Sequence, residues 1–254
     1  MSVESVLSQI PGFKGARIVG KLADGATSTT LLVEHLQRKY VLRIDKPSAQ
    51  ELGMNRMGEE VIYRSVAAAG LAPELVHTDH NQGIFLRQFI EGKTWLQSDL
   101  NDASKLDRLA SVLGKLHSLP AVEYRFNPAA YIDRYARNIA TGQARQLADK
   151  ALGLLAETEQ FQSGASLCHN DLVSHNIVES DSLMLIDWEF AGMGDPWFDL
   201  ATVVQHHGLA TDTGEQFLGQ YLHRKPLEDE LERLRANCKF YAILLKLWQL
   251  RTRA

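Results

Sequence analysis

The sequence predicts an α+β fold in two parts, a small β-rich N-terminal part and a larger helical C-terminal part. Short runs rich in β-branched and aromatic residues, joined by small-residue loops, dominate the beginning of the chain. After Gly92, apolar residues instead recur at intervals of three and four, which is the period of an amphipathic helix. We therefore expect one lobe over residues 1–91 and a second lobe over residues 92–254.

Residues 17–45 have the pattern of three antiparallel strands. "ARIVGKL" and "TTLLVEH" flank the loop "ADGATS", and "LQRK" turns into "YVLRID". Side chains alternate between the faces of a strand, which places Val41 and Arg43 on one face and Tyr40, Leu42 and Ile44 on the other.

A helix and a further strand complete the first part. Residues 52–69 have helical periodicity, with Met57, Val61, Val66 and Ala69 near one stripe. Residues 83–90, "GIFLRQFI", form an apolar-rich strand that stops at Glu91-Gly92.

In the second part, residues 106–117 form an amphipathic helix that ends before Pro120. Residues 129–160 indicate one or two polar helices, and residues 228–250 indicate a long amphipathic one.

Composition narrows the classes of function. The 254 residues include 27 basic and 31 acidic ones and carry a net charge of −4, which does not favour a nucleic-acid partner. Cys168 and Cys238 lie far apart, so we expect neither a disulfide framework nor a structural zinc site. No signal peptide and no membrane-spanning run is evident, so we expect a cytoplasmic location and no membrane partner. The oligomeric state is not indicated.

The densest group of polar residues is "HNDLVSHN", residues 169–176, followed by "LMLIDWEF". Asp171 and Asn176 are five positions apart, and Asp187 lies eleven beyond Asn176. Short apolar runs flank them and would hold them at strand ends and on the intervening loop. A metal site, a hydrolase site and a phosphoryl-transfer site all use such residues.

The spacing resembles the kinase pattern H-R-D-L-x-x-x-N followed by D-F-G. Here Asn170 replaces the arginine, and Trp188-Glu189 replaces Phe-Gly. With "GDPWFDLA" after it, the segment is similar to the aminoglycoside phosphotransferase and choline kinase family, nearest its bacterial choline kinase and thiamine kinase branches. Asp195 and Asp199 match the acidic tail of that family.

The resemblance implies a protein-kinase-like bilobal fold that phosphorylates a hydroxyl of a small molecule with ATP and Mg²⁺. Phosphoryl transfer requires a carboxylate beside the acceptor hydroxyl and oxygen ligands for Mg²⁺. We assign Asp171 to the first role, as the catalytic residue, and Asn176 and Asp187 to the second.

The first part can then be interpreted as the nucleotide-binding lobe. Arg43 would hold the phosphates, paired with Glu59 or, failing that, Glu60. The loop residues Ser28, Thr29 and Thr30 are expected to contact the phosphates of the nucleotide, and Val41 is expected to contact its adenine base. In the connecting segment Gln88-Phe89-Ile90, we assign Gln88 and Ile90 to nucleotide binding.

Other residues have plainer interpretations. His169 braces its loop, and His175, His206 and His207 lie at the surface. A zinc site of His169, Asp171 and His175 has unusual spacing. Asp199 holds the catalytic loop, and Asp195 caps a helix that has Pro196 at its first position. Five aromatic residues could enclose a cation, but most of them are better explained as part of the hydrophobic core: Trp188, Phe190, Trp197, Phe198 and Trp248.

The expected acceptor is a cationic alcohol such as choline, ethanolamine or thiamine. An aminoglycoside acceptor and a nucleotide-binding pseudokinase are the alternatives. A metal-dependent hydrolase would leave Arg43 and Glu59 unexplained.

Overall fold

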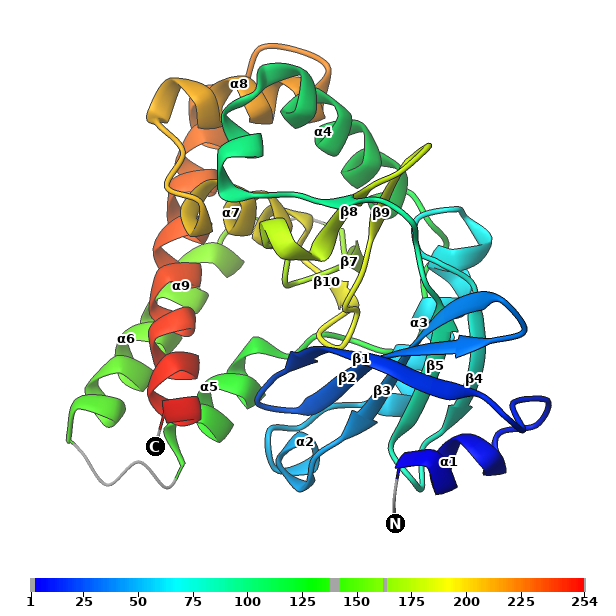
Figure 1. Ribbon diagram of the computed structural model, residues 1–254. Helices are drawn as coiled ribbons and strands as arrows, with labels where there is room; N and C mark the ends of the chain where they lie inside the picture. Colours follow the sequence, from blue (N-terminus) through cyan, green and yellow to red (C-terminus); the bar gives the residue numbers. More distant parts are fainter. Residues whose placement is uncertain (1–2, 138–141, 162–163, 254) are drawn as a thin grey trace. The chain divides into compact units, whose positions relative to one another are not determined.

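An antiparallel sheet with the strand order β1-β2-β3-β5-β4 forms the N-terminal part of the computed structural model (Figure 1). The structure describes residues 3–137, 142–161 and 164–253. Contacts divide the chain into two units, Met1–Glu91 and Gly92–Ala254. The strands of the first unit are β1 (Arg17–Asp24), β2 (Ser28–His35), β3 (Arg38–Asp45), β4 (Leu75–Asp79) and β5 (Ile84–Gln88).

One face of this sheet is covered by an N-terminal helix, α1 (Val3–Gln9), which the sequence pattern did not predict. Leu7 and Ile10 pack there against buried strand residues such as Leu42. Tyr40 and Ile44 join the same cluster, which confirms the predicted alternation along β3.

Helix α3 (Arg56–Ala68) contributes Glu59 and Tyr63 to contacts with the sheet residues Arg43 and Phe85. The predicted apolar stripe was wrong at its N-terminal end, because Met57 is 61% exposed and Val61 45% exposed. The buried face of α3 instead contains Glu59, Ile62, Tyr63 and Val66. The ion pair of Glu59 with Arg43 of β3 fixes this face toward the sheet. A short helix, α2 (Pro47–Glu51), precedes α3.

The second unit is mainly helical, with small sheets ordered β10-β7 and β6-β8-β9. Its helices are η1 (Gln97–Asn101), α4 (Ala103–His117), α5 (Pro128–Ala136), α6 (Gly142–Glu159), η2 (Ser174–Asn176), α7 (Pro196–His206), α8 (Thr211–Leu222) and α9 (Glu228–Arg253). Its strands are β6 (Lys93–Thr94), β7 (Ser166–Cys168), β8 (Ile177–Glu179), β9 (Leu183–Leu185) and β10 (Gly192–Gly194).

The helical predictions for residues 106–117 and 228–250 are confirmed by α4 and α9. The predicted polar region 129–160 forms α5 and α6, and its positions 138–141 lie outside the described residues. The long helix α9 packs along α6 and α7 (Figure 1).

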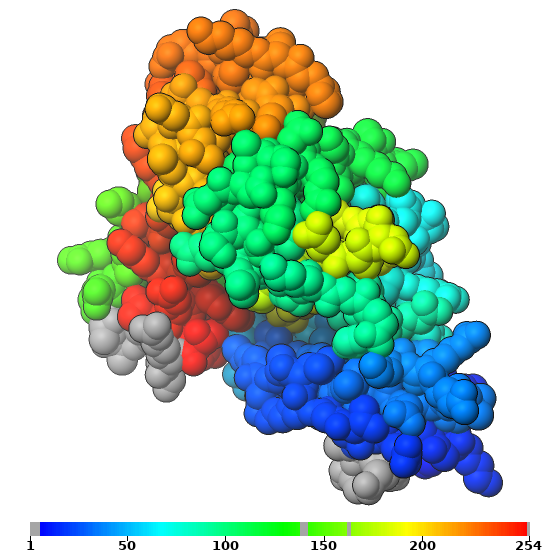
Figure 2. All heavy atoms as spheres, turned by 45° about the horizontal axis from the view of Figure 1, so that its top comes forward, coloured from blue at the N-terminus to red at the C-terminus, as the bar shows by residue number. Residues whose placement is uncertain are grey.

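On the face shown in Figure 2, the β8–β9 hairpin lies beside α4, where the Arg108 guanidinium donates to Glu179. Within the described residues, none of the helices combines the length and the apolar character that crossing a lipid bilayer requires.

Candidate active site

Residues 169–176 form a loop that leaves β7 and enters η2 and β8. Asp199, in the first turn of α7, holds the start of this loop. Its Oδ2 accepts the N–H of His169 at 2.8 Å, and its Oδ1 accepts the N–H of Asn170 at 2.7 Å. Asn170 has a left-handed backbone with φ of 65°, a conformation that needs such support in a residue with a side chain. The prediction that Asp199 holds the loop is confirmed.

His169 is fully buried and braces the loop from within, as predicted. Its Nδ1 accepts the N–H of Asp171 at 3.3 Å, and its Nε2 lies 3.0 Å from the carbonyl oxygen of Ile186. The lone pair of Nδ1 accepts the Asp171 N–H, and the proton on Nε2 is donated to the Ile186 carbonyl, so neither nitrogen is available to bind zinc. His175 is exposed, as expected.

Asp171 and Asn176 are in direct contact. The Asn176 amide nitrogen donates to Oδ2 of Asp171 at 3.1 Å and to its backbone carbonyl at 2.9 Å. Burial raises the pKa of Asp171 to about 7, the negative charges of Asp187 and Asp199 add to this rise, and the bond from Asn176 opposes it.

Asp187 lies just beyond β9 with an exposed side chain. Its backbone is also left-handed, with φ of 65°. Such a conformation costs about 1–3 kcal/mol and persists where its surroundings impose it, typically at functional sites.

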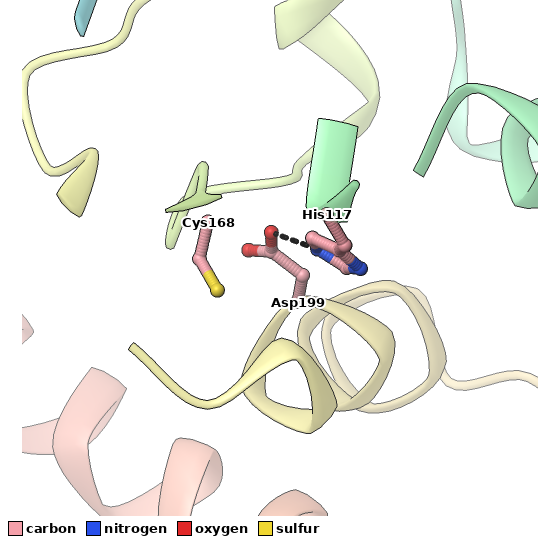
Figure 3. A group of neighbouring side chains, drawn as sticks. All are labelled: His117, Cys168 and Asp199. Carbon is pink, nitrogen blue, oxygen red and sulfur yellow. Dashed lines mark hydrogen bonds and ion pairs between the residues drawn. The ribbon is translucent and has the colours of Figure 1, made fainter. Parts of the chain in front are cut away.

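Three potential metal ligands meet behind the loop, namely His117, Cys168 and Asp199 (Figure 3). Their ligand atoms lie within 4.8 Å of one another. Both Asp199 oxygens already accept backbone N–H groups, and Oδ2 also lies 3.1 Å from Nε2 of His117. Burial raises the pKa of the Cys168 thiol well above its usual value, with the charges of Asp199 and Asp195 adding to the rise. The cluster therefore braces the loop and is poorly suited to a metal, which needs a thiolate.

Helix α7 begins as predicted. Asp195 accepts the N–H of Trp197 at 3.1 Å, and Pro196 occupies the first turn. The surface prediction was wrong for His207, which is buried with only 6% exposure. Sequence reasoning predicted where α7 begins but not where it ends, and His207 is the C-cap residue of that helix.

In the first unit, Arg43 forms a two-pronged ion pair with Glu59. Nη1 of Arg43 lies 2.5 Å from Oε1 of Glu59, and Nη2 lies 2.7 Å from Oε2. Arg56 also donates to Glu59, at 2.8 Å, and to Asp45 at 2.7 Å. Burial opposes the charge of Glu59, but the guanidiniums of Arg43 and Arg56 outweigh it and hold the pKa of Glu59 below its usual value.

The loop between β1 and β2 is shorter than predicted. It spans residues 25–27, and Ser28, Thr29 and Thr30 belong to β2. The hairpin continues because Asp24 pairs with Thr29 across the strands and accepts its hydroxyl at 3.1 Å. Ser28 was therefore wrongly placed in the loop, whereas Thr29 and Thr30 lie in the strand that the run "TTLLVEH" predicted.

The carbonyl groups of the shortened loop all accept hydrogen bonds from Lys46 or from Ser48 in the first turn of α2. The Lys46 amine donates to Gly25, the Ser48 hydroxyl to Ala26, and the Lys46 N–H to Thr27. This fixes the orientation of the peptide units at the tip of the hairpin.

The segment after β5 is partly engaged in the sheet. The N–H groups of Gln88 and Phe89 donate to the carbonyls of Glu74 and Lys39. The Gln88 carbonyl accepts from the Arg87 guanidinium at 3.0 Å. Among the described residues no acceptor for the N–H of Ile90 is found. Val41 is buried in β3.

Four aromatic rings in the second unit form a closed circuit of contacts, which joins Tyr131 and Tyr135 of α5, Trp248 of α9, and Phe190. Centroid distances around it are 5.7, 5.2, 5.7 and 5.8 Å. Burial raises the pKa of Tyr135 well above its usual value, and the negative charges of Glu189 and Asp171 add to the rise.

Of the aromatic residues singled out from the sequence, only Phe190 and Trp248 belong to the aromatic circuit. Trp188, Trp197 and Phe198 are buried, as the core interpretation predicted.

A family model described as the phosphotransferase enzyme family matches residues 19–236. The chain belongs to this family. Protein LicA from Haemophilus influenzae is 30% identical over 214 residues, which are 79% of this chain and 61% of that protein. Thiamine kinase from Escherichia coli is 27% identical over 218 residues, 79% of this chain and 69% of that protein. The crystal structure of choline kinase LicA from Streptococcus pneumoniae superposes with a TM-score of 0.79 at 21% identity, covering 99% of this chain and 89% of that one.

The predicted family and the protein-kinase-like fold are thus confirmed. In this phosphotransferase family member, sequence reasoning missed Arg56, Asp45 and the two tyrosines of the aromatic circuit. Arg56 and Asp45 flank the predicted Arg43–Glu59 pair along the chain, so their charge was a usable signal. The tyrosines lie in α5, far in sequence from Trp248, and no local pattern connects them.

The oxygen groups of this family member suit Mg²⁺ in their chemistry. Asp187 offers an exposed carboxylate. Asn176 uses its amide nitrogen on Asp171, which leaves its amide oxygen for a cation. Hard divalent cations prefer such oxygen ligands.

Proposed function

We propose that the protein transfers the γ-phosphoryl group of ATP to a hydroxyl of a small cationic alcohol. The acceptor oxygen forms a new bond to phosphorus while the bond to the β-phosphate oxygen breaks and ADP leaves. The hydroxyl proton passes to the Asp171 carboxylate and then to solvent. The Cys168 thiol near His117 and Asp199 is buried and has a raised pKa, which makes it a poor nucleophile, and we infer that transfer is direct.

The observation that carries this proposal is the Asp171–Asn176 contact on a loop held by Asp199. A base that removes a proton must stay in one place and have a pKa near the working pH. The loop bonds provide the first condition, and the pKa of about 7 provides the second.

Asn176 and Asp187 are the proposed Mg²⁺ ligands. The ion would neutralise charge on the transferred phosphoryl group. The charge of Asp187 also raises the pKa of Asp171, which indicates that the two carboxylates act on a common region.

The first unit is proposed to bind the nucleotide. Arg43, oriented by Glu59, would contact the phosphates, and the Ile90 N–H would bind the adenine edge beside Gln88. The fixed tip at residues 25–27 and the adjoining side chains of Ser28, Thr29 and Thr30 form the proposed phosphate cap, and Val41 is the proposed contact to the adenine base.

A cationic acceptor is supported by the aromatic circuit together with Glu189 and Asp171. Aromatic faces and carboxylates both attract an ammonium or thiazolium group. The names of the relatives, choline kinase and thiamine kinase, point to acceptors of this kind.

The test is an ATP-consumption screen over choline, ethanolamine, thiamine, aminoglycosides and neutral sugars, with mass analysis of each product. We expect a phosphorylated product with one cationic alcohol. Turnover confined to aminoglycosides would replace the acceptor class. ATP binding without any product would favour the pseudokinase alternative.

A further inference from the structure

Helix α7 contacts the catalytic loop at both ends of that loop. Asp199 binds the N–H groups at its start, as described above. His207, the residue that ends α7, binds the far end, because its Nε2 accepts the N–H of Ser174 at 3.0 Å. Ser174 is the first residue of η2, the turn that carries Asn176.

The Ser174 N–H needs an acceptor from outside its own turn. The first N–H groups of a helical turn have no partner within that turn. Neighbouring N–H groups are satisfied locally, since Val173 donates to the Asp171 carbonyl and Asn176 to the Val173 carbonyl. The imidazole of His207 supplies the acceptor that the Ser174 N–H does not find within its own turn.

His207 is itself held in one orientation. Its Nδ1 lies 2.9 Å from the carbonyl oxygen of Val203, one turn earlier in α7, and its own carbonyl accepts from the Gln97 amide at 3.2 Å. The carbonyl of Val203 requires a proton on Nδ1, so Nε2 presents its lone pair to Ser174.

The neutral form of His207 persists over the working pH range. Burial lowers the pKa of this imidazole to about 4. The bond to Val203 opposes the shift, and the charges of His206 and His175 add to it. The ring thus remains an acceptor for Ser174.

We propose that His207 is a positioning residue for phosphoryl transfer, which acts through the Ser174 N–H to set the place of Asn176. This inference rests on the proposed function, because it assumes that Asn176 binds Mg²⁺. His207 itself touches neither substrate nor metal.

Two substitutions separate the two bonds of the imidazole. In His207→Asn, the amide nitrogen can replace Nδ1 and keep the bond to Val203, but the contact to Ser174 is lost. In His207→Gln, the amide oxygen can replace Nε2 and keep the contact to Ser174. His223→Asn is the matched control, because His223 is exposed and left-handed, a conformation that asparagine tolerates.

For His207→Asn we expect a fall in kcat of about tenfold and a higher Mg²⁺ requirement, with little change in the KM for the acceptor. In the ligand-free protein, amide hydrogen exchange of the peptide containing Ser174 should accelerate by about tenfold. His207→Gln should recover most of both properties, and His223→Asn should match the wild type.

Wild-type exchange and Mg²⁺ requirement in His207→Asn would overturn the inference. Equal losses of kcat and of exchange protection in His207→Gln and His207→Asn would overturn it as well, because keeping the contact to Ser174 would then make no difference. If Asn176→Ala leaves the Mg²⁺ requirement unchanged while His207→Asn still accelerates exchange, the contact stands and the proposed metal role fails.

Discussion

Asp171, the proposed catalytic base, illustrates how a residue suited to catalysis can oppose stability. Burial first, and then the charges of Asp187 and Asp199, raise its pKa to about 7 in the folded protein. The unfolded chain has the ordinary pKa of about 3.9. Between these values the native state holds a proton that the unfolded state has lost. The contribution of Asp171 to the free energy of unfolding is therefore fully present below about pH 4, and it is lost progressively as the pH rises to about 7.

Asp171→Asn should consequently stabilise the ligand-free protein more at about pH 8 than at about pH 5. The pKa difference sets an upper limit of about 4 kcal/mol. Because the carboxylate is partly exposed and partly screened, we expect about 1–2 kcal/mol at the higher pH. Urea unfolding at both pH values measures this, and an equal effect at the two would show that the raised pKa is not its origin.

Glu59 is the second residue whose environment leads to a quantitative expectation. Its side chain is 2% exposed and pairs with both Arg43 and Arg56, so its neutralisation leaves two largely buried guanidiniums with Asp45 as their remaining shared carboxylate. Glu59→Gln should destabilise the protein by about 2 kcal/mol or more and weaken ATP binding.

The neighbouring Glu60→Gln is the control. Its side chain is 20% exposed and pairs with the more exposed Arg64, so its loss should be below about 1 kcal/mol with ATP binding unchanged. Equal effects of the two substitutions in urea unfolding and ATP titration would contradict the distinct role of Glu59.

At the scale of elements, the aromatic circuit connects α5 to α9 through Tyr135 and Trp248, whose ring centroids are 5.2 Å apart. Trp248→Leu should raise the KM for a cationic acceptor by about threefold to thirtyfold, because a cation–π contact contributes about 0.5–2 kcal/mol. The KM for ATP should stay constant, and Trp248→Phe should keep most of the affinity. Steady-state kinetics with the acceptor from the screen measures this, and a wild-type acceptor KM in Trp248→Leu would remove the aromatic circuit from the acceptor site.

The sequence predicted elements with strong periodicity and missed those that depend on tertiary contacts. The strands around Arg43 and the helices α4 and α9 follow local patterns and were predicted. The inward face of α3 was misjudged because an ion pair to β3, which no local pattern reveals, turns Glu59 inward and Met57 outward. The start of α7 at Asp195 and Pro196 was predicted, but its length and its C-terminal end beside His207 were not.

For the site, the spacing of Asp171, Asn176 and Asp187 indicated the chemistry because each type of residue suits one role. The bracing roles of Asp199 and His169 were also predicted, but the contacts that hold Asp199 and the far end of the loop were not. The Ser174 N–H donates to Nε2 of His207, which lies 33 positions further along the chain. Oδ2 of Asp199 lies 3.1 Å from Nε2 of His117 in α4. Such contacts follow from how the helices pack, which one sequence does not display.

At the scale of the whole molecule, the two units carry different parts of the proposed reaction. The first contains the Arg43–Glu59 pair for the nucleotide, and the second contains Asp171, Asn176 and Asp187 for the chemistry. The central claim is that Asp171 removes the proton of the acceptor hydroxyl.

The most direct test is to compare wild type with Asp171→Asn, using one acceptor and Mg²⁺-ATP, for both ATP binding and formation of the phosphorylated product. We predict that the substitution leaves ATP affinity within about twofold and lowers the rate of product formation by about a hundredfold or more. Product formation at the wild-type rate would contradict the assignment of Asp171 as the base.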